Sequence, residues 1–265
     1  MKSNNFSIGV FDSGIGGTSI WQEITSLLPK ENTIYLSDSK NAPYGDKSKQ
    51  EIIDLSIKNT QYLLDKNCKL IVVACNTATT NAIKVLRHKF KIPFIGIEPA
   101  IKPASLKTKT NTIGILATKG TLNSDLFEKT SRNINKKIII KETIGKGLVE
   151  LIEEGKINSL EMSKLLSLYL NPMLEENVDC LVLGCTHYPY LIPKIREIIG
   201  DKIEIIDSGQ AVAKQTKAIL EKHQLLNTDD IMGTHQFYIN KNKEVLELIL
   251  SKNNNKNITV KQQDF

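Results

Sequence analysis

Two cysteines occupy positions where a side chain could do chemistry. Cys75 and Cys185 each follow an apolar, strand-like segment, and polar residues come next: Asn76 and Thr77 after the first, Thr186 after the second. A thiol at the start of a helix or tight turn has its thiolate stabilised by the helix dipole and by free backbone amides. We therefore interpret the two cysteines as a reactive pair. For either one alone, a small buried apolar residue is the alternative.

A histidine beside the second thiol supports this interpretation. His187 lies two residues after Cys185 and could tune the proton affinity of that thiol or donate to a substrate; an ordinary turn residue is the alternative. A single cysteine nucleophile with His187 as its base is a competing mechanism, but it leaves Cys75 without a role. The cysteine spacing lacks a Cys-x-x-Cys pair, so zinc is not expected. We interpret the other cysteines and histidines as packing or surface residues: Cys68, Cys180, His88, His223 and His235.

Further polar residues follow other strand-like segments. Asp12 and Ser13 come directly after the first one, before a glycine-rich turn at 14–17 that matches neither the dinucleotide nor the triphosphate fingerprint; a purely structural turn is the alternative. The loop 41–45 is expected to expose its tyrosine as a wall for a small anionic ligand, or to be only a turn. With the segment 118–121, these loops offer hydroxyl and amide groups around two thiols. Such a site fits a small, acidic, zwitterionic molecule.

The elements that must position these residues alternate in type along the chain. Short apolar segments predict strands, and stretches of helical periodicity separate them, a rhythm typical of parallel α/β sheets. Ligands of such sheets bind at the carboxyl ends of the strands, where the polar segments fall. Helix starts are marked by Ser48 with Glu51 and by Asn158 with Glu161, and a polar loop at 252–257 precedes a short last strand. The other predicted strands are 8–11, 34–36, 70–74, 94–97, 112–117, 137–140, 181–184 and 203–206.

An internal repeat predicts two similar lobes. The segment 8–13 reads like 113–118 at an offset of 105 residues, and the segment that ends in Cys75 reads like the one that ends in Cys185, at an offset of 110. Chance similarity of buried strands is the alternative. We expect an α/β protein of two pseudo-symmetric Rossmann-like or flavodoxin-like lobes with mainly parallel sheets and a site in the cleft between them. The predicted lobes are 1–97 with 208–265, and 98–207.

Composition excludes several classes of protein. A hydrophobic content of 40% and a charged content of 24% are globular proportions, not those of a disordered or fibrous chain. No apolar run approaches the ~18 residues of a membrane helix, and no signal-peptide core is apparent, so we expect a soluble, cytoplasmic protein with reduced cysteines. The net charge is +6, and the segment 98–146 holds ten basic and four acidic residues. We interpret that segment as a solvated face, with a weak nucleic-acid or anionic-partner surface as the alternative.

Six ordered motifs span nearly the whole chain: FDSGIGG at 11–17, NAPYG at 41–45, VACNTAT at 73–79, IGILAT at 113–118, LGCTHYPYL at 183–191 and IDSG at 206–209. Together they resemble those of the bacterial glutamate racemases, in the cofactor-independent aspartate/glutamate racemase superfamily. The resemblance implies an isomerase that interconverts L- and D-glutamate without a cofactor, for peptidoglycan synthesis and so for the cell wall and cell shape. We also expect a homodimer.

The resemblance also implies roles for particular residues. Cys75 and Cys185 are the opposed acid and base, with Asp12 supporting the first and His187 the second. The carboxylate implied near the second thiol is Glu153, although two other glutamates lie within three residues of it. The implied substrate contacts are Asp12, Ser13, Tyr44, Gly45, Asn76, Thr77, Thr118, Thr121, Thr186 and His187.

Inversion at an α-carbon explains why two thiols would be needed. One proton must leave from one face of the amino acid and another must arrive on the opposite face, so two groups avoid the swing of a single base. Backbone amides at Asn76, Thr77 and Thr186 would stabilise charge on the α-carboxylate. An enzyme acting on aspartate would carry the same thiols. A binding protein that inhibits DNA gyrase is the alternative from another class, but a pure binder needs neither cysteine.

Overall fold

Two parallel sheets form the framework, and their central strands are apolar without alternating polar residues. The computed structural model describes residues 3–134, 137–251 and 257–265, so only Asn257 of the expected polar loop 252–257 falls within it. The first sheet contains β1 (Ile8–Asp12), β2 (Thr33–Ser37), β3 (Leu70–Val73), β4 (Phe94–Gly96), β9 (His235–Ile239) and β10 (Ile258–Gln262). The second contains β5 (Thr112–Ala117), β6 (Ile139–Ile144), β7 (Cys180–Gly184) and β8 (Glu204–Ile206).

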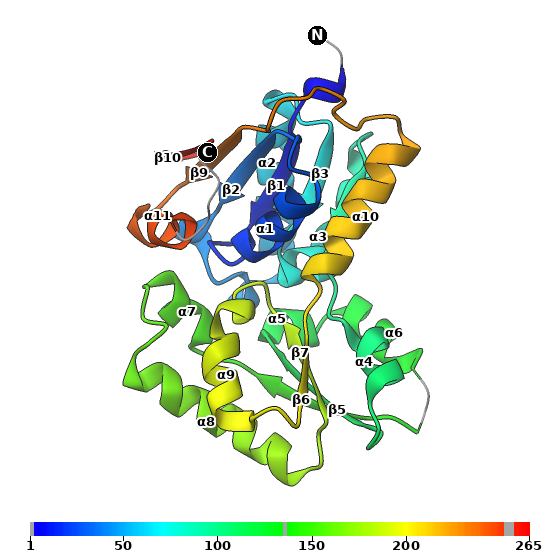
Figure 1. Ribbon diagram of the computed structural model, residues 1–265, viewed down its shortest axis with the longest axis vertical. Coiled ribbons are helices and arrows are strands. Elements are labelled where there is room, and N and C mark those ends of the chain that lie inside the picture. The colour runs from blue at the N-terminus through cyan, green and yellow to red at the C-terminus, as the bar shows by residue number, and fades with distance from the viewer. Residues whose placement is uncertain (1–2, 135–136, 252–256) are drawn as a thin grey trace.

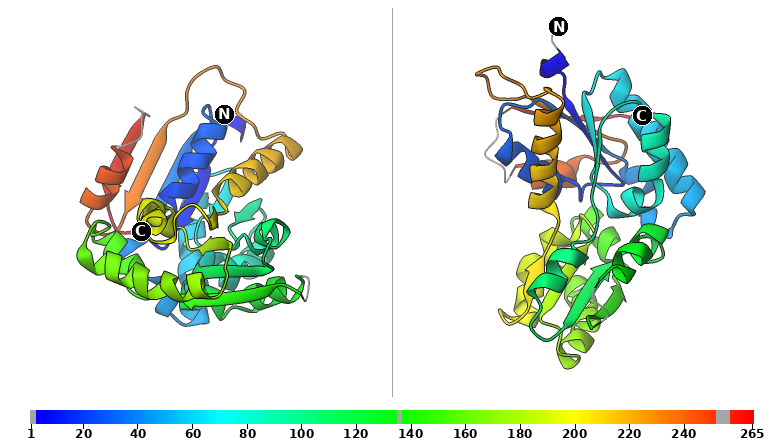
Figure 2. Two further views of the ribbon diagram at one scale, coloured as in Figure 1. Left: turned by 60° about the horizontal axis from the view of Figure 1, so that its bottom comes forward. Right: turned by 90° about the vertical axis from the view of Figure 1, so that its right-hand side faces the viewer.

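The strand order brings the predicted site segments to the centre of each sheet. The orders are β10-β9-β2-β1-β3-β4 and β6-β5-β7-β8, and every pairing is parallel. The carboxyl ends of β1 and β3 are therefore neighbours in one sheet, and those of β5 and β7 are neighbours in the other. The two sheets lie in separate halves of the molecule (Figure 1, Figure 2). This confirms the predicted α/β architecture of two lobes.

Helices cover both faces of each sheet. We call the six-stranded sheet and its helices the upper lobe, and the four-stranded sheet and its helices the lower lobe, as Figure 1 shows them. The upper helices are α1 (Thr18–Leu27), α2 (Lys49–Asp65), α3 (Asn76–Lys89), α10 (Gly209–Lys222) and α11 (Glu244–Leu250), with the short helices η1 (Ser3–Asn5), η2 (Ser39–Asn41) and η3 (Tyr44–Asp46). The lower helices are α4 (Ile101–Lys107), α5 (Lys119–Leu122), α6 (Asp125–Arg132), α7 (Leu148–Glu153), α8 (Leu160–Glu175) and α9 (Ile192–Ile199), with η4 (Tyr188–Leu191).

Successive strand residues face opposite layers, which gives each sheet two cores. In β1, Val10 packs in the cluster that includes residues of α1 and α10, whereas Phe11 packs in the cluster under α2 and α3. In β5, Leu116 joins the cluster of α8 and α9, and Ile115 joins the cluster of α4 and α6. Burial on both faces is why these strands are uniformly apolar.

The chain crosses between the lobes at two neighbouring points. The upper sheet draws its strands from residues 8–96 and 235–262, and the lower sheet from 112–206. Ser208 Oγ donates a hydrogen bond to the carbonyl oxygen of Glu98 over 2.5 Å, which ties the two crossings together. We propose the lobe boundaries at 97/98 and 207/208 on this support.

Three details differ from the expectations. β6 covers Ile139–Ile144 rather than 137–140. It is an edge strand that is only partly buried, so it carries polar residues, whereas the prediction relied on a run of apolar ones. Ser159, not Asn158, caps α8, since its side chain accepts from Met162 N. β9 was not predicted. The predicted helix start at Ser48 is confirmed, since Ser48 and Glu51 form a capping box at the beginning of α2.

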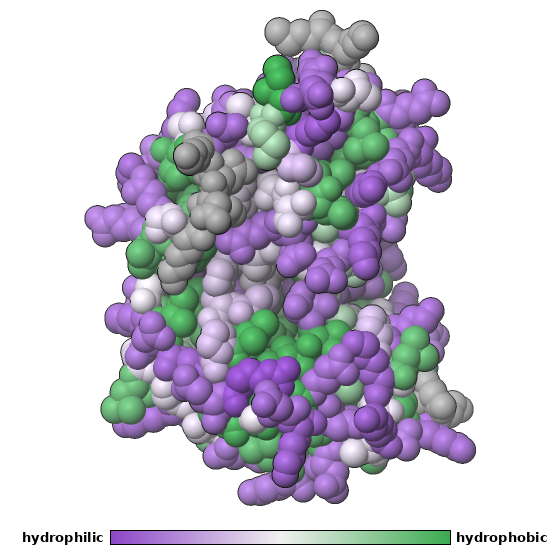
Figure 3. Space-filling model, viewed as in Figure 1, coloured by the Kyte–Doolittle hydropathy of each residue, from purple (hydrophilic) through white to green (hydrophobic). Residues whose placement is uncertain are grey.

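One face of the molecule can be described by its hydropathy. On the face shown in Figure 3, hydrophilic side chains predominate over both lobes. No helix in the described part of the chain is long and apolar enough to cross a membrane.

A buried histidine in β9 gives the fold a testable pH dependence. His235 is 1% exposed; its Nδ1 lies 2.9 Å from Thr33 Oγ1, and its Nε2 has no hydrogen-bond partner among the described residues. Burial lowers the pKa of His235 from 6.5 to about 4. Between these pH values the unfolded chain binds a proton that the folded chain does not. Stability is therefore lost as pH falls from about 6.5 to about 4, by about 3 kcal/mol from this group.

We expect His235→Gln to remove this part of the pH dependence. Urea denaturation at a series of pH values between 7 and 4 measures the slope of the unfolding free energy for the variant and the wild type. The exposed His88 provides the control, since His88→Gln should keep the wild-type slope. An equal slope in His235→Gln and wild type would contradict the assignment.

Candidate active site

Cys75 stands at the start of α3, directly beyond the carboxyl end of β3. Its Sγ accepts from Ala78 N over 3.4 Å and donates to Ser13 Oγ over 3.5 Å. Ser13 Oγ in turn lies 3.5 Å from Asp12 Oδ1, and the other oxygen of Asp12 accepts from Gly17 N over 2.8 Å. Cys75, Ser13 and Asp12 thus form a chain of hydrogen-bonded groups, from thiol to hydroxyl to carboxylate, that leads into the upper lobe; we call such a chain a row.

Burial sets the protonation of this row. It raises the pKa of Asp12 from 3.8 to about 6, against the charge of His187 and the hydrogen bond from Gly17. Burial first, and then the negative charge of Asp12, raises the pKa of the Cys75 thiol well above its ordinary value. Cys75 is therefore held as a neutral thiol.

Cys185 has a different set of partners beyond the carboxyl end of β7. His187 Nδ1 lies 3.7 Å from Cys185 Sγ, and the other ring nitrogen lies 2.6 Å from Glu153 Oε1. Glu153 also accepts from Ile15 N and from Ser39 Oγ, each over 2.6 Å. The row from this thiol therefore runs from imidazole to carboxylate and ends on the upper lobe.

The imidazole–carboxylate pair carries charge although it is buried. Burial alone would lower the pKa of His187, but its hydrogen bonds to Cys185 and Glu153 raise the pKa well above 6.5. Burial would raise the pKa of Glu153, but the hydrogen bond and charge of His187 lower it, with help from Ser39 and Ile15. The raised pKa of His187 favours a protonated ring beside the sulfur of Cys185, whereas the carboxylate of Asp12 lies behind Cys75.

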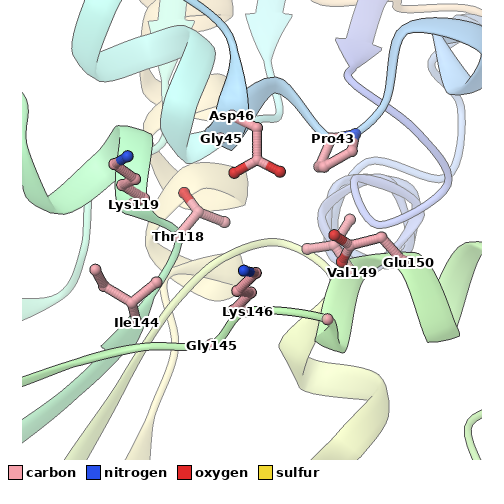
Figure 4. A pocket seen from close by; sticks show the side chains of 11 residues that line it. Pro43, Gly45, Asp46, Thr118, Lys119, Ile144, Gly145, Lys146, Val149 and Glu150 are labelled. Carbon is pink, nitrogen blue, oxygen red and sulfur yellow. The ribbon is translucent and has the colours of Figure 1, made fainter.

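Both thiols line one small cavity between the lobes. Its volume of about 10 Å³ is room for about one water molecule and not for an amino acid. A more open cavity of about 340 Å³ adjoins it and shares Pro43, Gly45, Thr118 and Val149 with it (Figure 4). A substrate that enters through the outer cavity must therefore separate the lobes or move side chains to reach the thiols.

Most of the implied substrate contacts meet in the small cavity. Two of them stand behind it: Asp12, as described, and Thr121, whose hydroxyl lies 3.3 Å from that of Thr77 and 3.0 Å from that of Thr118. The amide nitrogen and oxygen of the Asn76 side chain are buried without a hydrogen-bond partner among the described residues, so they remain available to a ligand. The implied contacts that line the cavity are Ser13, Tyr44, Gly45, Asn76, Thr77, Thr118, Thr186 and His187.

The expectation of an exposed tyrosine in the loop 41–45 is wrong. Tyr44 is 1% exposed, and its hydroxyl donates to Asp38 Oδ2 over 2.5 Å. Asn59 Nδ2 donates to the same hydroxyl over 3.2 Å. The ring is thus a buried anchor, and the loop offers its backbone to the cavity.

Of the three neighbouring glutamates, the geometry connects Glu153 to the second thiol. Glu150 faces the outer cavity, and Glu154 pairs with Lys156 over 2.7 Å. Sequence reasoning missed Ser39, although it follows β2 at the same sheet edge as the other site residues. It also missed Val149, which lines both cavities, because an apolar residue on a helix carries no chemical signal.

Glycines in the turn after β1 allow the lobes to touch. A Cβ added at Gly14 would lie 1.9 Å from Glu153 Oε1, and one at Gly16 would lie 2.2 Å from His187 Nδ1. No side chain fits at either position, because the lower-lobe side chains pack directly on the backbone of the turn. The glycine pattern thus serves contact between the lobes and not a phosphate.

Several known proteins that are similar to this chain in sequence or in fold are glutamate racemases. A glutamate racemase from Ralstonia pickettii is 47% identical over 207 residues, which are 78% of this chain and 73% of that protein. A solved glutamate racemase isoform from Bacillus anthracis has a TM-score of 0.86 at 31% identity, over 99% of this chain and 98% of the other. The structure of a Francisella tularensis glutamate racemase in complex with D-glutamate has a TM-score of 0.84 at 30% identity, over 98% of each chain. Fold, site and similarity together define an isomerase of the amino-acid racemase class.

The family follows from the sequence match. The model of the Asp/Glu/Hydantoin racemase family matches residues 8–216, from β1 into α10, and so includes both cysteines. The chain belongs to the Asp/Glu/Hydantoin racemase family. The resemblance found in the motifs is thereby confirmed.

We expect Gly16→Ala to lower kcat/KM for amino-acid racemisation by about 100-fold or more, because the new methyl group must displace the His187 ring or part the lobes. Circular dichroism of the substrate measures the rate, and a thermal melt checks that the variant folds. Gly209→Ala is a matched control, since its Cβ would meet only the flexible Glu23 side chain at 3.0 Å and Asp207 Oδ1 at 3.1 Å. Wild-type activity in Gly16→Ala would disprove the close contact.

Proposed function

We propose that this protein interconverts L- and D-glutamate by two-base catalysis with Cys75 and Cys185, and needs no cofactor. The observation that carries the proposal is the meeting of two thiols from two lobes in one cavity, each backed by a different ionisable group. A single-nucleophile enzyme would have no use for the second thiol.

The proton balance of the proposed reaction is as follows. The family resemblance assigns Cys185 to the L-enantiomer and Cys75 to the D-enantiomer. Cys185 as thiolate takes the α-proton of L-glutamate from one face, and the Cys75 thiol gives its proton to the opposite face. The protein is left with the opposite protonation of the pair, which is the starting state for D-glutamate.

The surroundings of the thiols support these roles. Burial and Asp12 hold Cys75 as a thiol, ready to donate, and the imidazolium of His187 faces Cys185. Free amides at the start of α3 and the side-chain amide of Asn76 are suited to the substrate carboxylate, where charge develops when the α-proton leaves.

Glutamate is the proposed substrate because the similar proteins named above are glutamate racemases and one was solved with D-glutamate. Aspartate remains the competing substrate, since the same pair of thiols could invert it. D-Glutamate would serve peptidoglycan synthesis, and a cytoplasmic homodimer is part of the proposal. Binding to gyrase is not part of it.

We expect the optical activity of L-glutamate to decay to zero with the purified protein and that of L-aspartate to persist. Circular dichroism measures both, with buffer alone as the blank. Activity should survive dialysis against a chelator, because thiols perform the proton transfer. A requirement for added metal or pyridoxal phosphate would refute the cofactor-free mechanism, and faster decay of aspartate would refute the substrate.

Replacing each thiol should separate the two faces of the reaction. We expect Cys75→Ser and Cys185→Ser each to lower racemisation by about 1,000-fold or more. Elimination from a β-substituted glutamate needs proton abstraction from one face only. Cys75→Ser should therefore retain elimination from the L-form, and Cys185→Ser from the D-form, as measured by release of the leaving group.

Two results would restore the single-nucleophile mechanism. One is full racemisation in either variant. The other is loss of elimination from the same enantiomer in both variants. Cys68→Ser is the matched control, because this buried thiol lies before β3 and away from the cavity.

A further inference from the structure

Ser39 is an upper-lobe side chain that reaches into the acid–base row of the lower lobe. It follows β2, begins η2 and is 2% exposed. Its hydroxyl donates to Glu153 Oε2 over 2.6 Å and lies 3.0 Å from the hydroxyl of Ser37. The neighbouring Asp38 is fixed by Tyr44 and by Asn240 at the end of β9, so η2 starts from an anchored residue.

The hydroxyl of Ser39 completes the set of donors around Glu153. One carboxylate oxygen receives Ile15 N and His187 Nε2, and Ser39 holds the other oxygen. His187 then presents Nδ1 to Cys185. Gly16 N also donates to His187 Nε2 over 3.2 Å. The orientation of the imidazole at Cys185 therefore depends on this amide and on a carboxylate that two upper-lobe donors hold in place.

The row behind Cys75 is built differently. Its members Ser13, Asp12 and Ala78 all belong to the upper lobe, as Cys75 does. The cross-lobe hydrogen bond to Asp12, from Thr186 Oγ1, is longer, at 3.4 Å. Separation of the lobes would thus leave the surroundings of Cys75 largely intact while removing two of the donors on Glu153.

We propose that Ser39 is a positioning residue that completes the Glu153–His187–Cys185 row only when the lobes are closed, and so couples lobe closure to proton transfer at Cys185 alone. The inference rests on the proposed two-cysteine function. Closure is part of the cycle because the cavity around the thiols has a volume of about 10 Å³ and must open to admit an amino acid.

Charges around Glu153 define the expected pH effect. The titratable groups that face it are His187, with Cys185 behind, and on the upper lobe Asp12 and Tyr35. The hydrogen bond from Ser39 helps to keep the pKa of Glu153 low. Loss of this hydrogen bond would raise the pKa of Glu153. Glu153 would then become protonated at higher pH, and its hydrogen bond to His187 would weaken.

The test must measure proton abstraction by each thiol separately, that is, from each face of the α-carbon. Because L- and D-glutamate have equal free energies, kcat/KM for racemisation changes equally in both directions, and racemisation cannot distinguish them. Elimination from the L- and D-forms of a β-substituted glutamate can. We expect Ser39→Ala to lower kcat/KM for the L-form by about tenfold and to move the acidic limb of its pH profile to higher pH, with less than about a twofold change for the D-form.

Two further variants separate positioning from folding. Ser39→Thr keeps the hydroxyl and should restore most of the L-form activity and its pH profile. Ser56→Ala removes another buried hydroxyl, which donates to Ile52 O within α2, and should leave both enantiomers at wild-type rates.

Each outcome decides the matter. Equal loss for both enantiomers in Ser39→Ala, or no loss for either, overturns the role of Ser39 while the proposed function stands. Loss in the L-form that Ser39→Thr does not restore also overturns it, because the hydroxyl is then not the cause. A wild-type protein that eliminates from neither form overturns the proposed function itself, and this inference with it.

Discussion

The site depends on direct contact between lower-lobe side chains and the upper-lobe backbone at the turn after β1. Glu153 and His187 pack where side chains of Gly14 and Gly16 would otherwise stand, and the N–H of Ile15 donates to the carboxylate between them. The parallel sheets set up this contact, because the carboxyl ends of β1 and β3 face those of β5 and β7 across the cleft. Each lobe alone would present one thiol to solvent; together they enclose two.

Equivalent positions in the two lobes have received chemically different partners. Cys75 and Cys185 both follow the strand next to the first strand of their sheet, as the repeat predicts. Yet the group next to Cys75 is the hydroxyl of Ser13, backed by Asp12, and the group next to Cys185 is the imidazole of His187, backed by Glu153. A symmetric pair would favour the same protonation of both sulfurs. The proposed two-base inversion needs one proton between the two sulfurs, and unequal surroundings fit that requirement.

Sequence reasoning located the site better than it described its interior. Strands buried on both faces are plain in the sequence, and polar residues at their ends mark the sheet edge. The sequence therefore places the thiols, Asp12 and His187 at that edge, which is where they lie in the structure. Ser39 stands at the same edge, but a single serine gives no sign of a partner 114 positions away. Tyr44 was expected to be exposed because turn residues usually are. Instead its hydroxyl donates a hydrogen bond to Asp38 inside the protein, and no local sequence pattern predicts that contact. The edge strand β6 and the late strand β9 depend on pairing with distant strands, and local pattern does not report such pairing.

The closed cavity and the unpaired amide of Asn76 belong together. A buried polar group without a partner costs about 1–3 kcal/mol. Within the described part of the chain, the side chain of Asn76 has no partner for either its donor or its acceptor. A bound carboxylate would satisfy the donor and so offset part of that cost. In the same closed arrangement, Ile15 N and Ser39 Oγ donate hydrogen bonds to the Glu153 carboxylate. Under the proposed function, binding energy from the substrate carboxylate would favour the arrangement in which the second thiol has its partners, and would link recognition of an acidic amino acid to the chemistry at its α-carbon.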